Sequence, residues 1–328
     1  MIRILYLTPE GKIETQLTSE QISSAMHTEQ GMLWIDIMDE PIDSCEDILR
    51  EKCGFHPLAV SDALQTIHVP KVDDWDWFIY LVLHGISLLN SEDNEITSKE
   101  LDIFIGKNFI VTYEEFPLSE VEIVWKLCQQ DERYLKRGSA YILYRLADEL
   151  IDDYTQAIDS IEDTIENIED AIFNDPQPET LQQIFTIKRT LLHLRRIITP
   201  QRDVLNKFAR DEYTVIDAQY RVFFRDVYDH LVRLTDVNDS MRELVGEALN
   251  SYLSVVNNRL NDIMKVLTII TTLFMPLSFL TGFFGMNFFQ PVVNLESWTG
   301  MTAFIIILAV MALVPISMFL WIKRQHWM

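Results

Sequence analysis

The sequence has 328 residues, which suits about two domains, and it carries 27 Lys and Arg against 50 Asp and Glu, a formal net charge of −23. This acidic excess argues against a nucleic-acid partner, which would need a basic surface. Hydrophobic residues make up 48% of the chain and the mean hydropathy is +0.05, which is too apolar for a disordered protein or an ordinary acidic soluble one.

The charges are unevenly distributed along the chain. Residues 263–328 contain only three of the basic residues and one of the acidic ones, which leaves 24 basic and 49 acidic residues in 1–262. We therefore expect an acidic domain joined to a nearly uncharged tail. Three cysteines lie in the acidic part, and no C-x-x-C pair among them supports a disulfide framework or a zinc knuckle.

Residues 1–112 alternate short apolar runs with turn signals, a pattern that predicts β-strands. We expect strands at 3–8, 13–17, 33–37, 77–89, 101–105 and 109–113. The last two flank Gly106-Lys107-Asn108 and should form a hairpin. Helical stretches are expected near 43–52 and 57–64.

From about Leu118 onward, apolar residues recur with the 3.6-residue period of helices. One helix is expected over 139–174, where Asp175-Pro176-Gln177-Pro178 ends it, and the next over 179–209. From 217 to 284 the chain has a single proline and two internal glycines. One continuous helix of 68 residues would be about 100 Å long, a length that suits a stalk running into a membrane.

Two long stretches near the C-terminus are free of charge. Residues 266–284 and 301–322 contain 19 and 22 uncharged residues, and a helix needs roughly 20 to cross the hydrocarbon of a bilayer. Buried core helices are the alternative, but these stretches are apolar on every face. We expect two transmembrane helices.

The charges that flank the two spans predict their orientation. Basic residues lie before the first span and after the second: Arg259, Lys265, Lys323, Arg324 and His326. The connecting loop, 285–300, has no Lys or Arg. By the positive-inside rule both termini and the acidic domain are cytoplasmic, and the protein is a multi-pass protein of the cell's inner (plasma) membrane.

A stripe of small and polar residues follows one side of the first span. Its members recur at steps of three and four: Asn261, Met264, Thr268, Thr271, Met275, Ser278 and Gly282. This is the spacing of helices packed around a common axis, and its polar character suits helices that surround water. Close packing of small residues between helices in lipid explains the stripe equally well.

A short motif follows directly after the first span. Gly285-Met286-Asn287, with the flanking stretches 264–268 and 274–277, resembles the signature of the CorA divalent-cation transporters. Further stretches similar to that family occur at 54–58, 70–72, 150–154 and 228–230, so the resemblance covers most of the chain.

The resemblance implies a funnel-shaped homopentameric channel. Its parts would be an α+β cytoplasmic domain with an α/β/α sandwich (1–135), a helical stalk (136–262) and a membrane domain with two transmembrane helices and an external loop (263–328). The partners would then be further copies of the chain, the lipid bilayer and divalent cations, with no nucleic acid.

The resemblance also assigns roles to residues of the stripe. Mg²⁺ dehydrates reluctantly, so its path should hold the hydrated ion by neutral oxygens. Gly285, Met286 and Asn287 would form the selectivity filter. The polar pore lining would consist of Asn261, Thr268, Thr271 and Ser278. Apolar constrictions would be formed by Met264, Leu267 and Met275, although Leu267 lies off the strict heptad and its role rests on the resemblance alone.

The loop after the motif departs from the family pattern. Members often carry acidic residues there, whereas Phe288-Phe289-Gln290-Pro291 follows here and Glu296 is the only acid in the loop. The choice among Mg²⁺, Co²⁺, Ni²⁺ and Zn²⁺ is therefore open. Met286 favours Mg²⁺, since the related zinc-transporting ZntB branch often lacks it. The chain has no G-x-x-x-x-G-K-[ST] loop, and passive, potential-driven influx requires none.

Carboxylates of the acidic part are candidate regulatory ligands for Mg²⁺. Most of them simply keep the domain soluble. The resemblance selects Asp62 and Asp226 as partners in a divalent site between subunits and Asp148 at a neighbouring position. Ser61 stands where the family often has Glu, so it is a weaker second-site contributor. Mg²⁺ bound between subunits would close the channel.

Two other functions remain as alternatives. A proton-coupled Zn²⁺ importer of the ZntB type is the main rival among transporters. A membrane-anchored coiled-coil scaffold belongs to another class. An enzyme is not expected, because neither H-E-x-x-H nor G-x-S-x-G occurs in the sequence.

Overall fold

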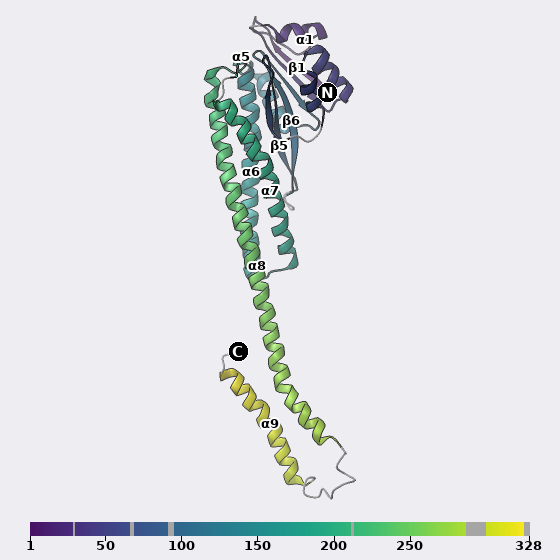
Figure 1. Cartoon of the computed structure of the whole chain (residues 1–328), viewed down its shortest axis with the longest axis vertical. Helices are drawn as coiled ribbons and strands as arrows, with labels where there is room; N and C mark the ends of the chain where they lie inside the picture. Colours follow the sequence, from purple (N-terminus) through teal and green to yellow (C-terminus); the bar gives the residue numbers. More distant parts are fainter. Residues whose placement is uncertain (29, 66–68, 91–94, 211–212, 287–299, 325–328) are drawn as a thin grey trace. The chain divides into compact units, whose positions relative to one another are not determined.

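The computed structural model describes residues 1–28, 30–65, 69–90, 95–210, 213–286 and 300–324 (Figure 1). The chain forms two compact units, Met1–Leu249 and Asn250–Met328. The helix α8 (Arg221–Phe284) contributes residues to both units.

The first unit is built on a seven-stranded sheet with the order β2-β1-β3-β7-β6-β5-β4. β3 and β7 are parallel, and the other neighbours are antiparallel. The strands are β1 (Ile2–Leu7), β2 (Ile13–Glu14), β3 (Met32–Met38), β4 (Lys71–Asp74), β5 (Ile79–Asn90), β6 (Glu95–Ile105) and β7 (Phe109–Glu114). The expected hairpin is confirmed as β6–β7.

Alternate residues of a strand point to the same face of the sheet, and on one face these residues are apolar. Short helices cover this apolar face. Leu33, Ile35 and Ile37 of β3 belong to a buried cluster with Phe55 and Phe104, whose rings stack 4.4 Å apart between centroids. The helical elements that contribute to this cluster are α1 (Ser19–Met26), α2 (Ile42–Glu46), the π-helix η1 (Asp47–Lys52) and α3 (Pro57–Ala63).

The other face carries a buried polar network beneath α4 (Ser119–Gln130). Trp34 Nε1 donates a hydrogen bond to Thr112 Oγ1 (3.0 Å), and Thr112 Oγ1 donates to Asp36 Oδ1 (2.6 Å). Arg3 Nε pairs with Asp36 Oδ2 at 2.7 Å, and its guanidinium lies 4.3 Å from the centre of the Trp125 ring. Burial raises the pKa of Asp36, and Thr112 and Arg3 oppose that shift.

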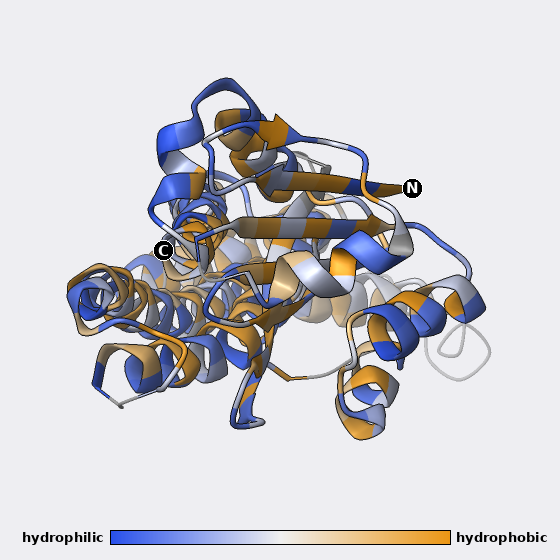
Figure 2. Cartoon of the chain, turned by 90° about the horizontal axis from the view of Figure 1, so that it is seen from above, coloured by the Kyte–Doolittle hydropathy of each residue, from blue (hydrophilic) through white to orange (hydrophobic). Residues whose placement is uncertain are grey.

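Long helices pack on this second face and on each other. After the short α5 (Glu132–Lys136) come α6 (Ser139–Asn174) and α7 (Pro178–Arg210), which contact the sheet and each other. Seen from above, the helices of the chain carry both hydrophobic (orange) and hydrophilic (blue) residues (Figure 2). The buried side of α6 has isoleucines at helical spacing: Ile158, Ile161, Ile165, Ile168 and Ile172. With helices on both faces of the sheet, the predicted α/β/α sandwich is confirmed.

The predicted elements agree with the structure to different degrees. The helix expected over 139–174 is α6, with identical bounds. The helix expected from 217 begins at Arg221, after a 3₁₀ turn at Ala218–Tyr220. The strand expected over 13–17 stops at Glu14, and neither α1 nor β4 was predicted. β4 is polar, and its pairing with β5 at the sheet edge holds it in place.

The second unit contains the rest of α8 and the helix α9 (Met301–Arg324). Both helices are long and apolar enough to cross a membrane, and only 6% of the apolar window of each is buried. Large side chains such as Met275, Phe279 and Met301 are at least 70% exposed in the single chain. Such surfaces are stable in lipid rather than in water.

We predict that Thr112→Val destabilises the first unit by about 1–3 kcal/mol, because it leaves the Trp34 N–H without an acceptor and the Oδ1 atom of Asp36 without its donor in a buried site. The measurement is the free energy of unfolding of the purified chain in urea. The matched control is Thr97→Val on β6, whose hydroxyl makes one longer bond, 3.3 Å to the carbonyl of Ser87. Equal effects of the two substitutions would contradict the role of the network.

Candidate functional site

The predicted stripe lies on α8, where each of its members is exposed in the single chain. The residues of α8 that are buried or half-buried occur on the opposite side of the same stretch: Ile269, Thr272, Leu273, Pro276, Leu277 and Leu280. α8 therefore has one covered face and one open face in this unit, and the stripe occupies the open face. An open polar face on an apolar helix needs water or further protein to cover it.

The threonine hydroxyls of the stripe have a defined hydrogen-bond direction. Thr268 Oγ1 donates to the carbonyl of Met264 (2.7 Å), and Thr271 Oγ1 donates to the carbonyl of Leu267 (2.9 Å). A hydroxyl has a single hydrogen, so these oxygens can only accept from any further partner. Water molecules bound to a cation direct their hydrogens outward, and acceptors are what they require. The stripe therefore presents groups suited to a hydrated cation.

The motif after the span is described only in part. Gly285 follows the last helical residue, and its N–H donates to the carbonyl of Thr281 (2.9 Å). A Cβ at Gly285 would lie 2.9 Å from that same carbonyl oxygen, which explains why glycine fits there. Met286 is 53% exposed. Asn287, the predicted centre of the filter, lies outside the described residues, as do residues 288–299 with Glu296.

Asp62 lies on α3 and is held by a lysine that sequence reasoning did not assign to it. Lys71 of β4 donates a hydrogen bond to the Asp62 carboxylate and pairs with Asp73 at 3.4 Å. Partial burial would lower the pKa of Lys71, but the two carboxylates raise it on balance. Ser61 is exposed and accepts a hydrogen bond from Gln65 (3.1 Å). A cation that binds at Asp62 therefore competes with Lys71.

Asp148 and Asp226 lie on neighbouring helices. Asp148 of α6 pairs with Arg145 at 2.7 Å, a partner that the spacing of three residues along the helix would have indicated. Partial burial raises the pKa of Asp148, whereas Arg145 and His230 act to lower it. His230 belongs to α8, one turn beyond the exposed Asp226. Asp148 thus faces the part of α8 that carries Asp226.

These acidic residues do not form a metal site within one chain. Among the described residues, no group of three or more His, Cys, Asp or Glu side chains is arranged to hold a metal ion. Asp62, Asp148 and Asp226 would need ligands from another copy of the chain to enclose one. The expectation of sites between subunits therefore stays a prediction.

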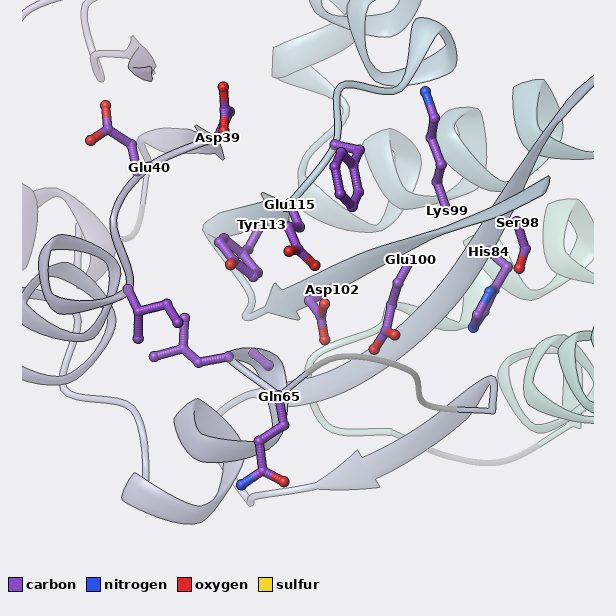
Figure 3. Close-up of a pocket in the computed structure, with 14 residues that line it drawn as sticks. Asp39, Glu40, Gln65, His84, Ser98, Lys99, Glu100, Asp102, Tyr113 and Glu115 are labelled. Carbon is purple, nitrogen blue, oxygen red and sulfur yellow. The ribbon is translucent and has the colours of Figure 1, made fainter. Parts of the chain in front are cut away.

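A cavity of about 520 Å³ on the first face of the sheet was not predicted (Figure 3). Five acidic residues line it: Asp39, Glu40, Glu100, Asp102 and Glu115. Asp102 is only 3% exposed and accepts a hydrogen bond of 2.5 Å from the hydroxyl of Tyr80. Burial and the neighbouring acids, Asp62 among them, raise the pKa of Asp102 well above its usual value. Asp62 therefore belongs to the electrostatic surroundings of this cavity.

Comparison with known proteins identifies the family of the chain. The model of the family described as CorA-like Mg²⁺ transporter protein matches residues 29–324. The chain belongs to the CorA family. The cobalt/magnesium transport protein CorA of Thermotoga maritima is 33% identical over 90% of this chain and 83% of its own length. The zinc transport protein ZntB of Yersinia pseudotuberculosis is 29% identical over 58% of this chain and 57% of its own length.

The fold of the whole chain matches a solved structure. The complete structure of the CorA magnesium transporter from Methanocaldococcus jannaschii superposes with a TM-score of 0.84 at 22% identity, over 100% of this chain and 99% of that one. The predicted fold class, an α/β domain followed by a long helix and two C-terminal transmembrane helices, is confirmed. CorA-family proteins are transporters rather than enzymes.

Proposed function

We propose that this chain forms a divalent-cation channel for passive Mg²⁺ influx driven by the membrane potential, with Co²⁺ and Ni²⁺ as further candidate ions. The observation that carries the proposal is the stripe of neutral acceptor oxygens on the open face of α8. Membership of the CorA family and the cobalt/magnesium name of the Thermotoga relative support the choice of ion.

The stripe suits a hydrated ion better than a bare one. Mg²⁺ requires near-ideal octahedral oxygen geometry and releases its water slowly. Hydroxyl and amide oxygens hold the water shell by hydrogen bonds and let the ion leave, whereas a buried ring of carboxylates would bind it tightly. We assign the entry filter to Asn287 with Gly285 and Met286. Met264, Leu267 and Met275 serve as apolar constrictions that close by excluding water.

A single stripe encloses no path, so the proposal requires several copies of the chain. Copies arranged around an axis would bring their α8 stripes together, and the family resemblance makes that assembly a homopentamer. The spacing of three and four residues fits helices packed about such an axis. Both termini would be cytoplasmic, as the basic residues beside each span indicate, in the plasma membrane.

The membrane potential is a sufficient energy source. A divalent ion that crosses 100 mV gains about 4.6 kcal/mol, at about 2.3 kcal/mol per charge. That free energy corresponds to an inward concentration ratio above a thousandfold. No further coupling is needed.

Feedback by cytoplasmic Mg²⁺ is the second part of the proposal. Asp62 and Asp226 of neighbouring copies would be bridged by Mg²⁺, with Asp148 and, more weakly, Ser61 at a neighbouring site. At ten times the dissociation constant one site contributes about 1.4 kcal/mol to the closed state, so five contribute about 7 kcal/mol. About 5.5 kcal/mol moves an equilibrium from mostly open to mostly closed, so five sites are enough.

A proton-coupled Zn²⁺ importer is the rival function, and similarity to the zinc transport protein ZntB favours it. The two functions differ in ion and in energy source. A pH gradient drives transport in the rival and has no effect on a passive Mg²⁺ channel.

We predict that liposomes holding the purified chain take up Mg²⁺ under an inside-negative potential at the same rate with and without a pH gradient. Co²⁺ and Ni²⁺ should compete with this flux, and Asn287→Ala should abolish it, because the ring of amide oxygens at the entrance is lost. The measurement is the fluorescence of a trapped Mg²⁺ indicator. The control is Asn294→Ala in the same loop, which should transport normally.

Three results would contradict the proposal. Uptake that needs the pH gradient and prefers Zn²⁺ would identify the importer. Unchanged uptake in Asn287→Ala would remove the filter, and a complete lack of uptake in active liposomes would favour the scaffold.

We predict that Asp62→Asn together with Asp226→Asn flattens the dependence of flux on internal Mg²⁺. Lys71→Met should act in the opposite direction and lower the half-inhibitory Mg²⁺ concentration about two- to fivefold, because an ion pair of this partly exposed kind is worth about 0.4–1 kcal/mol. Flux through liposomes at graded internal Mg²⁺ measures both effects. If the double variant is inhibited like the unmodified chain, Asp62 and Asp226 are not the sensor.

A further inference from the structure

Glu120, in the first turn of α4, is a buried acid in an incompletely satisfied site. Its side chain is 2% exposed, and Ser119 Oγ donates to its Oε2 at 3.0 Å. Its other oxygen, Oε1, is buried and receives no hydrogen bond from a conventional donor in the described part of the chain. The N-terminal end of a helix favours negative charge, and Glu120 lies at that end of α4.

The group that faces Glu120 is a second carboxyl group. Asp153 of α6 lies within hydrogen-bond reach of Glu120. Gly85 of β5 closes the site from the sheet side: a Cβ at Gly85 would lie 2.8 Å from Glu120 Oε1 and 2.6 Å from a methyl group of Leu118. Three elements of the first unit, β5, α4 and α6, therefore meet at this pair of acids.

No base neutralises the pair among the described residues that act on it. Asp152 and Glu149, both on α6, add further negative charge beside Asp153. Glu114 of β7 is a further buried acid that interacts electrostatically with Glu120. Arg145 is engaged by Asp148 and Glu149. The buried hydroxyl of Tyr154 donates to the carbonyl of His84 (2.7 Å) and so supplies no proton to the acids. The described side chains at this place form no cluster suited to a metal ion.

Two carboxyl groups in contact form a hydrogen bond only if one of them carries a proton. Burial, together with the contact with Glu120, raises the pKa of Asp153 to about 7. The proton therefore resides on Asp153 in mildly acidic solution and is donated to the carboxylate of Glu120.

We propose that Glu120 and Asp153 share one proton and that this proton ties α4 to α6, which makes the junction between the two helices sensitive to pH. When the proton leaves, two negative charges face each other, one buried on Glu120 and one partly buried on Asp153, and the junction weakens. Between about pH 4 and pH 7, the folded state keeps this proton, whereas the opened state has lost it, because Asp153 then has the pKa of an ordinary aspartate. The stability of the junction therefore falls as the pH rises through that window and is constant above it.

The test is hydrogen exchange of the α4 peptides in the full-length chain in detergent, at pH 5 to 8.5 and corrected for intrinsic exchange rates. The unmodified chain is compared with Asp153→Asn, whose amide can donate to Glu120 at every pH. The matched control is Asp159→Asn, an exposed acid on the same helix. Glu120→Gln serves as a second variant, so the test survives if one variant fails to fold.

The measured quantity is the ratio of the opening constant of α4 in the unmodified chain to that in Asp153→Asn. We expect this ratio to rise by up to tenfold per pH unit between pH 5 and about pH 7 and to stay constant above pH 7. Glu120→Gln should lose this rise, and Asp159→Asn should retain it. A ratio that stays constant from pH 5 to 8.5 would overturn the proposal. The proposal would also be overturned if the pair binds Mg²⁺ instead of a proton. In that case Mg²⁺ would slow the hydrogen exchange of α4 at pH 8 in the unmodified chain but not in Asp153→Asn.

Discussion

Mg²⁺ holds its water shell strongly, and the role that we propose for the α8 stripe depends on this constraint, because a path for the hydrated ion needs groups that bind water rather than the bare ion. The hydroxyls of Thr268 and Thr271 direct their hydrogens to carbonyls within the helix. Their oxygens are left as acceptors, which match the outward hydrogens of the water shell. Because the covered face of α8 lies opposite, the stripe is available to neighbouring copies and to water.

The acidic residues of the first unit lie in three kinds of surroundings. Most carboxylates lie on the surface and keep the domain soluble. A few are tied to a base, as Asp62 is to Lys71 and Asp148 to Arg145, and a cation that binds them has to displace that base. Others are buried with hydrogen-bond donors, and the Tyr80 hydroxyl on Asp102 is an example. A carboxylate's response to cations or to pH depends on which of these situations it occupies.

Sequence reasoning predicted the elements whose stability is local. α6 follows from a long 3.6-residue period that ends at Asp175-Pro176, and the apolar spans follow from composition. β4 was missed, since its Lys-Val-Asp-Asp sequence is polar and its pairing with β5 is a tertiary property. The stripe on α8 was predicted from spacing. The partner of Asp62, Lys71, lies on a different element, and the partner of Glu120, Asp153, lies on a different helix, so neither contact follows from a local pattern. Asn287 lies outside the described residues, so its role is still a prediction.

The most direct test of a water-lined stripe is the reactivity of single cysteines along α8 in membranes without Mg²⁺. The native cysteines, Cys45, Cys53 and Cys128, do not interfere, because they are buried and burial raises the pKa of each thiol. A charged, membrane-impermeant thiol reagent should modify Thr271→Cys and Ser278→Cys but not Thr272→Cys and Leu277→Cys on the covered face. Stripe cysteines as unreactive as those of the covered face would contradict the account.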